Sequence, residues 1–433
     1  MAGAASGYLG PTGGPRRYPE KPPENRSEAE RDHDRILYTS AFQRLAGITQ
    51  IAAPESGSPM HNRLTHTLKV SQLARRLAKR LGLDEDGQET AAAAALAHDL
   101  GHPPFGHIAE KELNLLADAW GGFEGNAQSF RIVNTLAARD PDYWGLNLTQ
   151  RTLNGILKYP WLRDPSVPRK KKKWGAYEHE IRAFRFAREG STSDRPSVEA
   201  SIMDWSDDVT YAVHDLDDFF RIGLIPLDRL VDDKDEERVR FRESFFTQIK
   251  GKRKLRPKFQ RISVKDLDAA LDFVFTGAFG AITPYRGSRS DRIDLRYQTS
   301  ALIGRFVQAV SLSGKTVRIK APQRAEVAVL KELAWYYVIT DPSLATIQHG
   351  QRRVICDLHQ IYCAAVDDPD EGWKLFPLAQ QELLDVTRDD DRRYRVATDF
   401  VAGLTESLAY ELHHRLTGVS RGSILDAAAR ATR

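Results

Sequence analysis

The segment from Glu89 to His107 constrains the fold of this 433-residue chain more than any other. It contains five consecutive alanines, and alanine has the highest intrinsic helix propensity, so a helix over residues 89–100 is predicted. Gly101 supplies a stop for this helix, and Pro103 and Pro104 force a turn directly after it. The chain therefore passes from a helix into a restricted turn within a few residues.

The rest of the pattern is helical nearly throughout. Ser27 and Glu30 form a capping-box signature, from which a helix to about Ile48 is predicted. Only the TVRI segment at 316–319 reads as a strand. We therefore predict an all-α helical bundle followed by a further, mostly helical C-terminal region. Additional helices are predicted over 64–81, 108–119, 127–138, 198–220 and 394–416.

The expected domain organisation follows from changes in composition. Residues 1–26 are rich in Gly and Pro and lack the apolar core of a secretory signal, so a disordered leader is expected there. A weak boundary lies near residues 222–236, where an acidic run follows a Gly and a Pro. This divides the remainder into a core over 27–225 and a C-terminal helical region over 226–433, expected to complete the site and form oligomer contacts.

Composition narrows the class of protein. No apolar run approaches the roughly 18–20 residues of a membrane span, and Cys356 and Cys363 make a poor disulfide pair, so a cytoplasmic protein with reduced thiols and no membrane partner is expected. The formal charge of +4 is small for this length. Two basic runs, at 169–173 (RKKKK) and 250–258 (KGKRKLRPK), are interpreted as solvated loops, with binding of nucleotide or nucleic acid as the alternative.

The turn after the alanine-rich helix gathers titratable side chains. His98, Asp99, His102 and His107 fall within ten positions, although the whole chain holds only 12 histidines. A buried aspartate is costly unless it is paired or bound to a metal. Helix capping by the His-Asp pair is the alternative interpretation, and it explains the pair better than it explains the histidines that follow. Imidazole and carboxylate ligands together suit a divalent ion.

A second set of acidic residues lies on the helix predicted over 198–220. Asp207, Tyr211 and Asp215 follow at steps of four residues, which places them on one face. The alternative is a solvated charged face. That alternative is preferred for Asp217 and Asp218, but it suits Asp207 poorly because apolar residues flank it.

These pieces together resemble the HD superfamily and, within it, the deoxyguanosine triphosphate triphosphohydrolase branch of the dNTP triphosphohydrolases. The resemblance covers roughly residues 30–220 in the family's order, and HDLGHPPFGH is its most specific motif. The C-terminal segment at 399–418 resembles the family's ending more loosely. The matching pieces are QRLAGITQ (43–50), HNRLTHTLKV (61–70), AHDLGHPPFGH (97–107), GGFEGNAQSFRIV (121–133), LKYP (157–160) and IMDWSDDVTYAVHDLDD (202–218).

The resemblance implies an HD-domain fold and a bound divalent ion, which could be Mg, Mn, Fe, Ni, Co or Zn. Its expected ligands are His66, His98, Asp99 and Asp207. Asp207 is preferred to its neighbour Asp208 because of the helical spacing described above. Such an ion can lower the pKa of a bound water and polarise a phosphoryl group.

The resemblance also assigns roles next to the ion. It implies that His107 is the catalytic acid or base, that Glu110 orients it, and that His102 contacts phosphates. Capping of the next helix by His107, with Glu110 in a surface ion pair, is the alternative. Arg63 is expected to hold a phosphate through two hydrogen bonds, with an ordinary surface arginine as the alternative.

The sugar pocket is implied in the same way. Gln50, Tyr211 and Asp215 are expected around the deoxyribose, where a tyrosine under the sugar leaves little room for a 2′-hydroxyl. For Glu124, Asn126 and Gln128, capping by Asn126 and substrate contact are equally good interpretations. Arg352 and Arg353 are interpreted either as nucleotide contacts or as surface helix positions.

The predicted activity is metal-dependent hydrolysis of deoxynucleoside triphosphates, dGTP or a broader set, to deoxynucleoside and tripolyphosphate. An HD phosphohydrolase acting on monophosphates, cyclic nucleotides or guanosine polyphosphates is a second hypothesis. A nucleotide- or nucleic-acid-responsive regulator with a vestigial site is a third. Similar proteins form homo-oligomers and respond to nucleotides or single-stranded DNA, so both properties are expectations for this chain.

Overall fold

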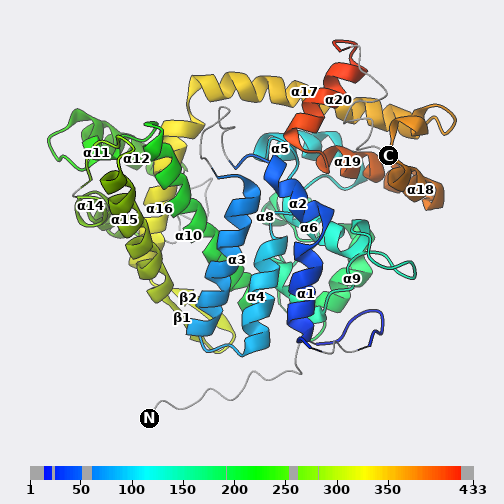
Figure 1. Ribbon diagram of the computed structural model, residues 1–433, viewed down its shortest axis with the longest axis horizontal. Coiled ribbons are helices and arrows are strands. Elements are labelled where there is room, and N and C mark those ends of the chain that lie inside the picture. Colours follow the sequence, from blue (N-terminus) through cyan, green and yellow to red (C-terminus); the bar gives the residue numbers. More distant parts are fainter. Residues whose placement is uncertain are drawn as a thin grey trace. The chain divides into compact units, whose positions relative to one another are not determined.

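A computed structural model of the protein describes residues 14–21, 25–50, 61–191, 193–252, 262–280 and 282–420 (Figure 1). These residues are mostly helical, and their only sheet is the antiparallel hairpin of β1 (Val310–Ser313) and β2 (Thr316–Ile319). The all-α prediction is therefore confirmed, as is the strand at 316–319. None of the described helices is long and apolar enough to cross a membrane.

The chain divides into two compact units that do not follow the order of the sequence. The first comprises residues 1–53, 62–203 and 347–433, and the second comprises 54–61 and 204–346. The sequence suggested a boundary near 222–236 instead. The difference arises because the last helices pack into the same core as the turn at 98–107, a long-range contact that composition does not report.

The first unit begins with two helices where one was expected. The structure confirms the capping box, in which Glu30 N–H donates to the side chain of Ser27. The helix then ends at Leu37, because Thr39 caps a new helix by accepting from Phe42 N–H. The helices in this part of the unit are α1 (Glu28–Leu37), α2 (Ser40–Arg44), α3 (Arg63–Arg80), α4 (Glu85–Ala97), α5 (His107–Leu116), α6 (Gly125–Arg131), α7 (Gln150–Ile156), α8 (Pro168–Lys172) and α9 (Ile181–Ala187).

Helix α4 lies in the middle of this unit because its small residues allow close helix packing. Its alanines are fully buried. Ser71 of α3 donates to the carbonyl of Ala92 at 2.9 Å, and a Cβ on Gly155 of α7 would lie 3.1 Å from the Cβ of Ala94. The helix begins at Glu85, earlier than expected, and ends at Ala97, so the following His and Asp lie in the turn.

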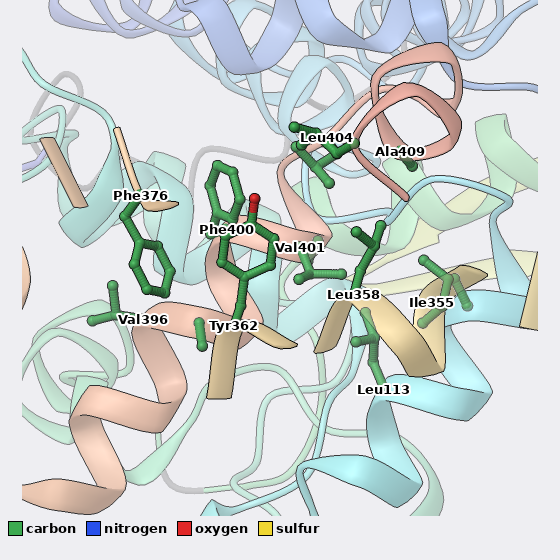
Figure 2. Packing of buried hydrophobic residues seen from close by; sticks show 14 of the residues in the cluster. Leu113, Ile355, Leu358, Tyr362, Phe376, Val396, Phe400, Val401, Leu404 and Ala409 are labelled. Atoms are coloured by element: carbon green, nitrogen blue, oxygen red, sulfur yellow. The ribbon is translucent and has the colours of Figure 1, made fainter. Parts of the chain in front are cut away.

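The C-terminal helices of the first unit share a core with α5 (Figure 2). Tyr362, Phe376 and Phe400 contact one another in this core, with ring centroids 4.6–5.7 Å apart. A single helix was expected over 394–416, but the chain forms two, because Thr405 caps the second one. These elements are α17 (Pro342–Val366), α18 (Leu378–Val386), α19 (Asp390–Ala402) and α20 (Glu406–Leu416).

The second unit is organised around aromatic residues. The ring of Phe241 lies 5.9 Å from Phe275 and 6.0 Å from Tyr337, and both phenylalanines are buried. Helix α10 (Val198–Arg221) begins in the first unit and continues into this one. The other helices are α11 (Leu227–Leu230), α12 (Glu236–Lys252), α14 (Val264–Asp272), α15 (Arg289–Gln308) and α16 (Ala321–Ala334).

Short 3₁₀ and π segments extend or join these helices. The 3₁₀ segments are Leu45–Gly47, Asp118–Trp120, Glu178–Glu180 and Gly372–Leu375, and the π segments are Ile132–Leu136, Phe273–Ala278 and Trp335–Ile339.

Two predictions concern segments that lie largely outside the described residues. One is the basic run at 250–258, most of which is not described, and the other is the leader expected over 1–26, of which more than half is not described. Within the described part of that leader, Arg16 pairs with Glu28 and Asp32, and Glu20 pairs with Arg35.

Candidate active site

The turn between α4 and α5 is shaped by close packing against α6. A Cβ on Gly101 would lie 2.2 Å from the carbonyl oxygen of Gly125 and 2.3 Å from the amide nitrogen of Ser129, so only glycine fits there. Phe105 and Gly106 then adopt φ values of 65° and 58°. Gly101 was expected to stop the helix, but the structure shows that its lack of a side chain allows the backbone of α6 to approach closely.

Two side chains of this turn face one another. His98 places Nδ1 2.6 Å from the carbonyl oxygen of Ala95, and its Nε2 lies 3.3 Å from Oδ1 of Asp99. Both side chains are buried. A histidine that donates Nδ1–H to a backbone carbonyl presents the lone pair of Nε2, which is the common arrangement for a metal ligand.

Helix α3 brings His66 and Arg63 to the same turn. Asn62 caps this helix by accepting from Thr65 N–H at 3.0 Å. His66 is buried one turn later, and its ring centroid lies 5.8 Å from that of His98. Arg63 is also buried and donates from Nη1 to Oδ2 of Asp99 at 2.9 Å. The surface interpretation of Arg63 is therefore wrong.

His102 lies against the same carboxylate. Its Nδ1 is 3.1 Å from Oδ1 of Asp99, and the side chain is nearly fully buried. Burial and the charge of Arg63 lower the pKa of His102 to about 3. Burial alone would raise the pKa of Asp99, but the neighbouring His98, His102 and Arg63 hold it well below the usual value. Asp99 therefore carries a negative charge in a site otherwise rich in nitrogen atoms.

His107 is the exposed member of the group. Its side chain is 74% exposed, whereas that of Glu110 is only 10% exposed. Nδ1 of His107 lies 2.8 Å from Oε2 of Glu110, and the rings of His102 and His107 are 5.6 Å apart. The carboxylate of Glu110 is thus not part of a surface ion pair. It orients an imidazole whose Nε2 is accessible.

Glu110 has a further partner that sequence reasoning missed. Lys173, the last residue of the basic run at 169–173, donates to Oε1 of Glu110 at 2.6 Å and to Oε1 of Glu124 at 2.8 Å. The other cations of the run fit the interpretation as a solvated segment, since Arg169 and Lys170 pair with Asp194 at the surface.

The structure decides between the interpretations of the segment at 124–128. Glu124 caps α6 by accepting from the backbone N–H groups of Asn126 and Ala127 at 2.7 and 3.1 Å. Capping by Asn126, one of the two interpretations left open, is therefore wrong. Gln128 is buried and donates to Asp399 at 2.8 Å, so its amide has a structural partner.

The acidic residues of α10 lie in the second unit. Asp207, Tyr211 and Asp215 occupy successive turns of one unbroken helix. Asp208 pairs with Lys331 of α16, and the ammonium of Lys331 lies 5.1 Å from the centre of the Tyr211 ring.

The solvated face expected at Asp217 and Asp218 is wrong, because both residues are buried. Asp217 pairs with Arg221 at 2.9 Å. Asp218 accepts from the backbone N–H of His61 at 2.9 Å and also contacts its ring. No local pattern indicates this tertiary partner of Asp218.

Two residues that are distant in the sequence, Arg44 and Glu406, hydrogen-bond the backbone of the turn. Arg44, at the end of α2, donates to the carbonyls of Leu100, His102 and Leu404 at 2.7, 2.9 and 3.1 Å. Burial and the charge of Arg63 lower the pKa of Arg44 to about 10. The guanidinium thus bonds the backbone of the turn directly to the segment between α19 and α20.

Glu406 of α20 is the second residue that hydrogen-bonds the turn. It accepts from the N–H of Thr49 at 2.9 Å, from its hydroxyl at 2.6 Å, and from the N–H of Phe105 at 3.2 Å. Gln50 follows Thr49 directly, and its carbonyl oxygen lies 3.5 Å from Nη2 of Arg63. Gln50 is therefore placed beside the turn within the first unit.

Arg352 and Arg353 each have an acidic partner. Arg352 pairs with Glu112 at 3.5 Å, and Arg353 pairs with Asp357 one helical turn away at 2.9 Å. These pairs account for both side chains as positions on the surface of α17.

The donor atoms of the first unit suit a divalent ion. A ring nitrogen of His66 lies within 4.8 Å of one of His98, and the carboxylate of Asp99 is adjacent to His98. Two imidazoles and an ionised carboxylate in a buried site form a mixed nitrogen and oxygen donor set that divalent transition metals accept. His102, His107 and Glu110 form another group whose ligand atoms lie within 4.8 Å of one another.

Comparison with known proteins agrees with this geometry. A family model described as the HD domain matches residues 63–211, which include the turn and most of α10, and a model described as the phosphohydrolase-associated domain matches residues 317–415. A deoxyguanosinetriphosphate triphosphohydrolase-like protein of Streptomyces coelicolor is 38% identical over 426 residues, covering 92% of this chain and 95% of the relative.

The chain belongs to the HD-domain family of deoxyguanosinetriphosphate triphosphohydrolase-like proteins. Relatives with the same name in Corynebacterium efficiens and Caulobacter are 34% and 32% identical, and the matches cover 91–93% of this chain and 92–93% of theirs. The family expected from the motifs is therefore confirmed. The second family model confirms that the looser C-terminal resemblance is also real.

Proposed function

We propose that this HD-domain protein hydrolyses deoxynucleoside triphosphates to deoxynucleoside and tripolyphosphate, using a divalent ion held by His66, His98, Asp99 and Asp207. One observation carries this proposal. The buried side chains of His66, His98 and Asp99 lie at the same turn as the exposed imidazole of His107, which Glu110 orients. The names of the relatives support a nucleoside triphosphate as the substrate class.

Asp207 is the proposed ligand from the second unit. Helix α10 is anchored in the first unit by Glu199, which accepts from Arg151 at 2.8 Å. The helix continues from there without a break for two turns to Asp207. Its neighbour Asp208 pairs with Lys331, whereas Asp207 shares one face of the helix with Tyr211 and Asp215, which favours Asp207 as the ligand. When bound, the ion supplies positive charge that polarises the phosphoryl group and favours ionisation of water.

Arg63 and His107 would stabilise the developing charge and transfer the proton, respectively. Arg63 lies beside Asp99 and carries a positive charge that stabilises negative charge developing on the phosphates. His107 donates Nδ1–H to Glu110, so its Nε2 can accept or deliver a proton at the reacting oxygen. The reaction adds one water across the bond between the α-phosphorus and the 5′-oxygen. The products are the deoxynucleoside and tripolyphosphate.

The sugar would be recognised by Gln50, Tyr211 and Asp215. Tyr211 and Asp215 are one turn apart on α10, and Gln50 lies next to Arg63. We propose that the tyrosine ring packs against the sugar and excludes a 2′-hydroxyl, which would favour deoxynucleotides over ribonucleotides.

Product analysis tests the proposal. The protein is incubated with each dNTP and with GTP, in the presence of Mg²⁺ or Mn²⁺, and the products are separated by anion-exchange chromatography. We expect tripolyphosphate and the free deoxynucleoside in equal amounts, and little turnover of GTP. Release of pyrophosphate and a monophosphate would contradict the bond assignment, and no turnover of any dNTP would contradict the proposed activity.

A further inference from the structure

Lys173 differs from the other cations of the run at 169–173. The lysines before it lie on the exposed short helix α8, whereas Lys173 is half-buried and contacts residues 49 and 63 positions away in the sequence. Its backbone is fixed as well, because its carbonyl accepts from Nε1 of Trp161 at 2.7 Å. The ammonium is therefore held in place by packing and by two carboxylates.

Those two carboxylates have different tasks. Glu124 caps α6 with Oε2 and offers Oε1 to Lys173, so it belongs to the scaffold. Glu110 offers Oε1 to Lys173 and Oε2 to Nδ1 of His107. Lys173 and His107 thus contact the two oxygens of one buried carboxylate, and the backbone N–H of Gly125 also donates to Oε1 at the longer distance of 3.4 Å. If the ammonium were absent, only this longer bond would hold Oε1, and the carboxylate of Glu110 could rotate away from the imidazole.

We propose that Lys173 is a positioning residue for the reaction and holds the carboxylate of Glu110 in the orientation that directs His107. This inference rests on the proposed function, in which His107 transfers a proton. Lys173 acts through Glu110 and needs no contact with substrate. An Arg at this position could make the same two contacts, whereas an apolar side chain could not.

The charges around Glu110 support this assignment. Lys173, His107, His102 and Glu124 face its carboxylate. Burial alone would raise the pKa of Glu110, but Lys173, followed by His107 and His102, holds it well below the usual value. Without Lys173 the acidic residues at 110 and 124 would repel each other in a buried site, and at least one would take up a proton more readily.

Steady-state kinetics with matched variants provide the first test. We expect Lys173→Met to lower kcat by at least about tenfold, with KM changed by less than about twofold, since the proton-transfer group is misoriented while binding groups remain. The acidic limb of the kcat/KM profile should move to higher pH. Lys173→Arg should restore most of the rate. Lys172→Met removes the same charge from the exposed neighbour and should match wild type.

A second control separates positioning from stability. Glu124→Gln removes the other carboxylate and leaves Lys173 with Glu110, so it should keep kcat within about twofold even if the melting temperature falls. A rate loss in Lys173→Met that is matched by Lys172→Met or Glu124→Gln would overturn the inference. So would an unchanged acidic limb.

A measurement without substrate distinguishes this inference from the proposed function. The carboxyl ¹³C resonance of Glu110 is titrated in labelled protein and assigned by its absence in Glu110→Gln. We expect its midpoint below pH 4.5, the ordinary value, in wild type and Lys173→Arg, and above it in Lys173→Met. An inactive protein with this shift would contradict only the proposed function. The same midpoint in wild type and Lys173→Met would overturn the role of Lys173.

Discussion

Glu406 holds Thr49 by two hydrogen bonds, one to the backbone N–H and one to the hydroxyl, although 357 residues separate the two in sequence. The same carboxylate accepts from Phe105 N–H in the turn that carries the histidines. Helix α20, which lies within the phosphohydrolase-associated region, therefore helps to hold the segment before Gln50 and the turn in place.

This contact can be tested by removing the carboxylate. Glu406→Ala leaves two backbone donors and a hydroxyl without their acceptor, so we expect the free energy of unfolding to fall by about 1–3 kcal/mol. Turnover should fall as well, because the segment at 49–50 and the turn both lose a support. Urea unfolding and kinetics measure the two effects. The exposed Glu371, paired with Lys374, provides the control, and Glu371→Ala should change stability by less than about 0.5 kcal/mol. Equal effects in both variants would contradict the prediction.

Gly101 provides a second test, at the close approach between the turn and α6. In Gly101→Ala the added methyl group meets the backbone of Gly125 and Ser129, which cannot yield as a flexible side chain would. We expect a loss of about 1–3 kcal/mol in urea unfolding, together with weaker metal binding, because His98 and Asp99 shift with the turn.

A glycine in open surroundings is the matched control for this substitution. A Cβ on Gly304 of α15 would meet nothing within 4 Å, so Gly304→Ala should raise stability by up to about 1 kcal/mol through helix propensity. If both alanine variants were equally stable, close packing could not be the reason for glycine at 101.

The choice of the fourth metal ligand gives a third prediction. Asp207→Asn should weaken binding of Mn²⁺ by at least about tenfold, because an amide is a much poorer ligand than a carboxylate. Asp208→Asn removes the partner of Lys331 and should retain the ion. Metal content after dialysis, measured by mass spectrometry, distinguishes the two variants. Loss of the ion in Asp208→Asn alone would reverse the assignment.

A fourth prediction concerns pH and the N-terminal segment. Although burial alone would raise the pKa of Glu20, hydrogen bonds from Arg35, Tyr143 and Asn147 lower it to about 2 from an ordinary value of 4.5. The contribution of Glu20 to stability is therefore fully present above pH 4.5 and is lost as the pH falls toward 2. The difference in unfolding free energy between wild type and Glu20→Gln should shrink over this interval. A difference that stayed constant from pH 6 to pH 3 would contradict this account.

Local signals in the sequence explain which parts of the fold were predictable. The capping box at Ser27 and the glycine after α3, Gly82 with φ 81°, act over a few residues, and both helix ends were predicted. The cap at Thr39 is equally local, but one continuous helix to about Ile48 was predicted across it. The break before Thr405 was missed in the same way. There a Cβ on Gly47 would lie 2.8 Å from the Thr405 methyl group, which is a tertiary contact.

In the candidate site, too, the residues with a local sequence signal were predictable and those with only long-range contacts were not. His98, Asp99, His102 and His107 were found because one short motif carries them, and the structure gathers them at one turn. Long-range partners such as Lys173 had no local signal, because its run of basic residues is typical of a solvated loop. Only the folded chain shows which member of that run is held between carboxylates.

Arg44 links two distant parts of the first unit through one planar guanidinium. Its rigid fork reaches the carbonyls at 100 and 102 and the carbonyl at 404 at the same time, so separating these segments would leave a buried cation short of hydrogen-bond acceptors. A shift of the segment between α19 and α20 would therefore also move the turn that carries the histidines, because the same guanidinium bonds both.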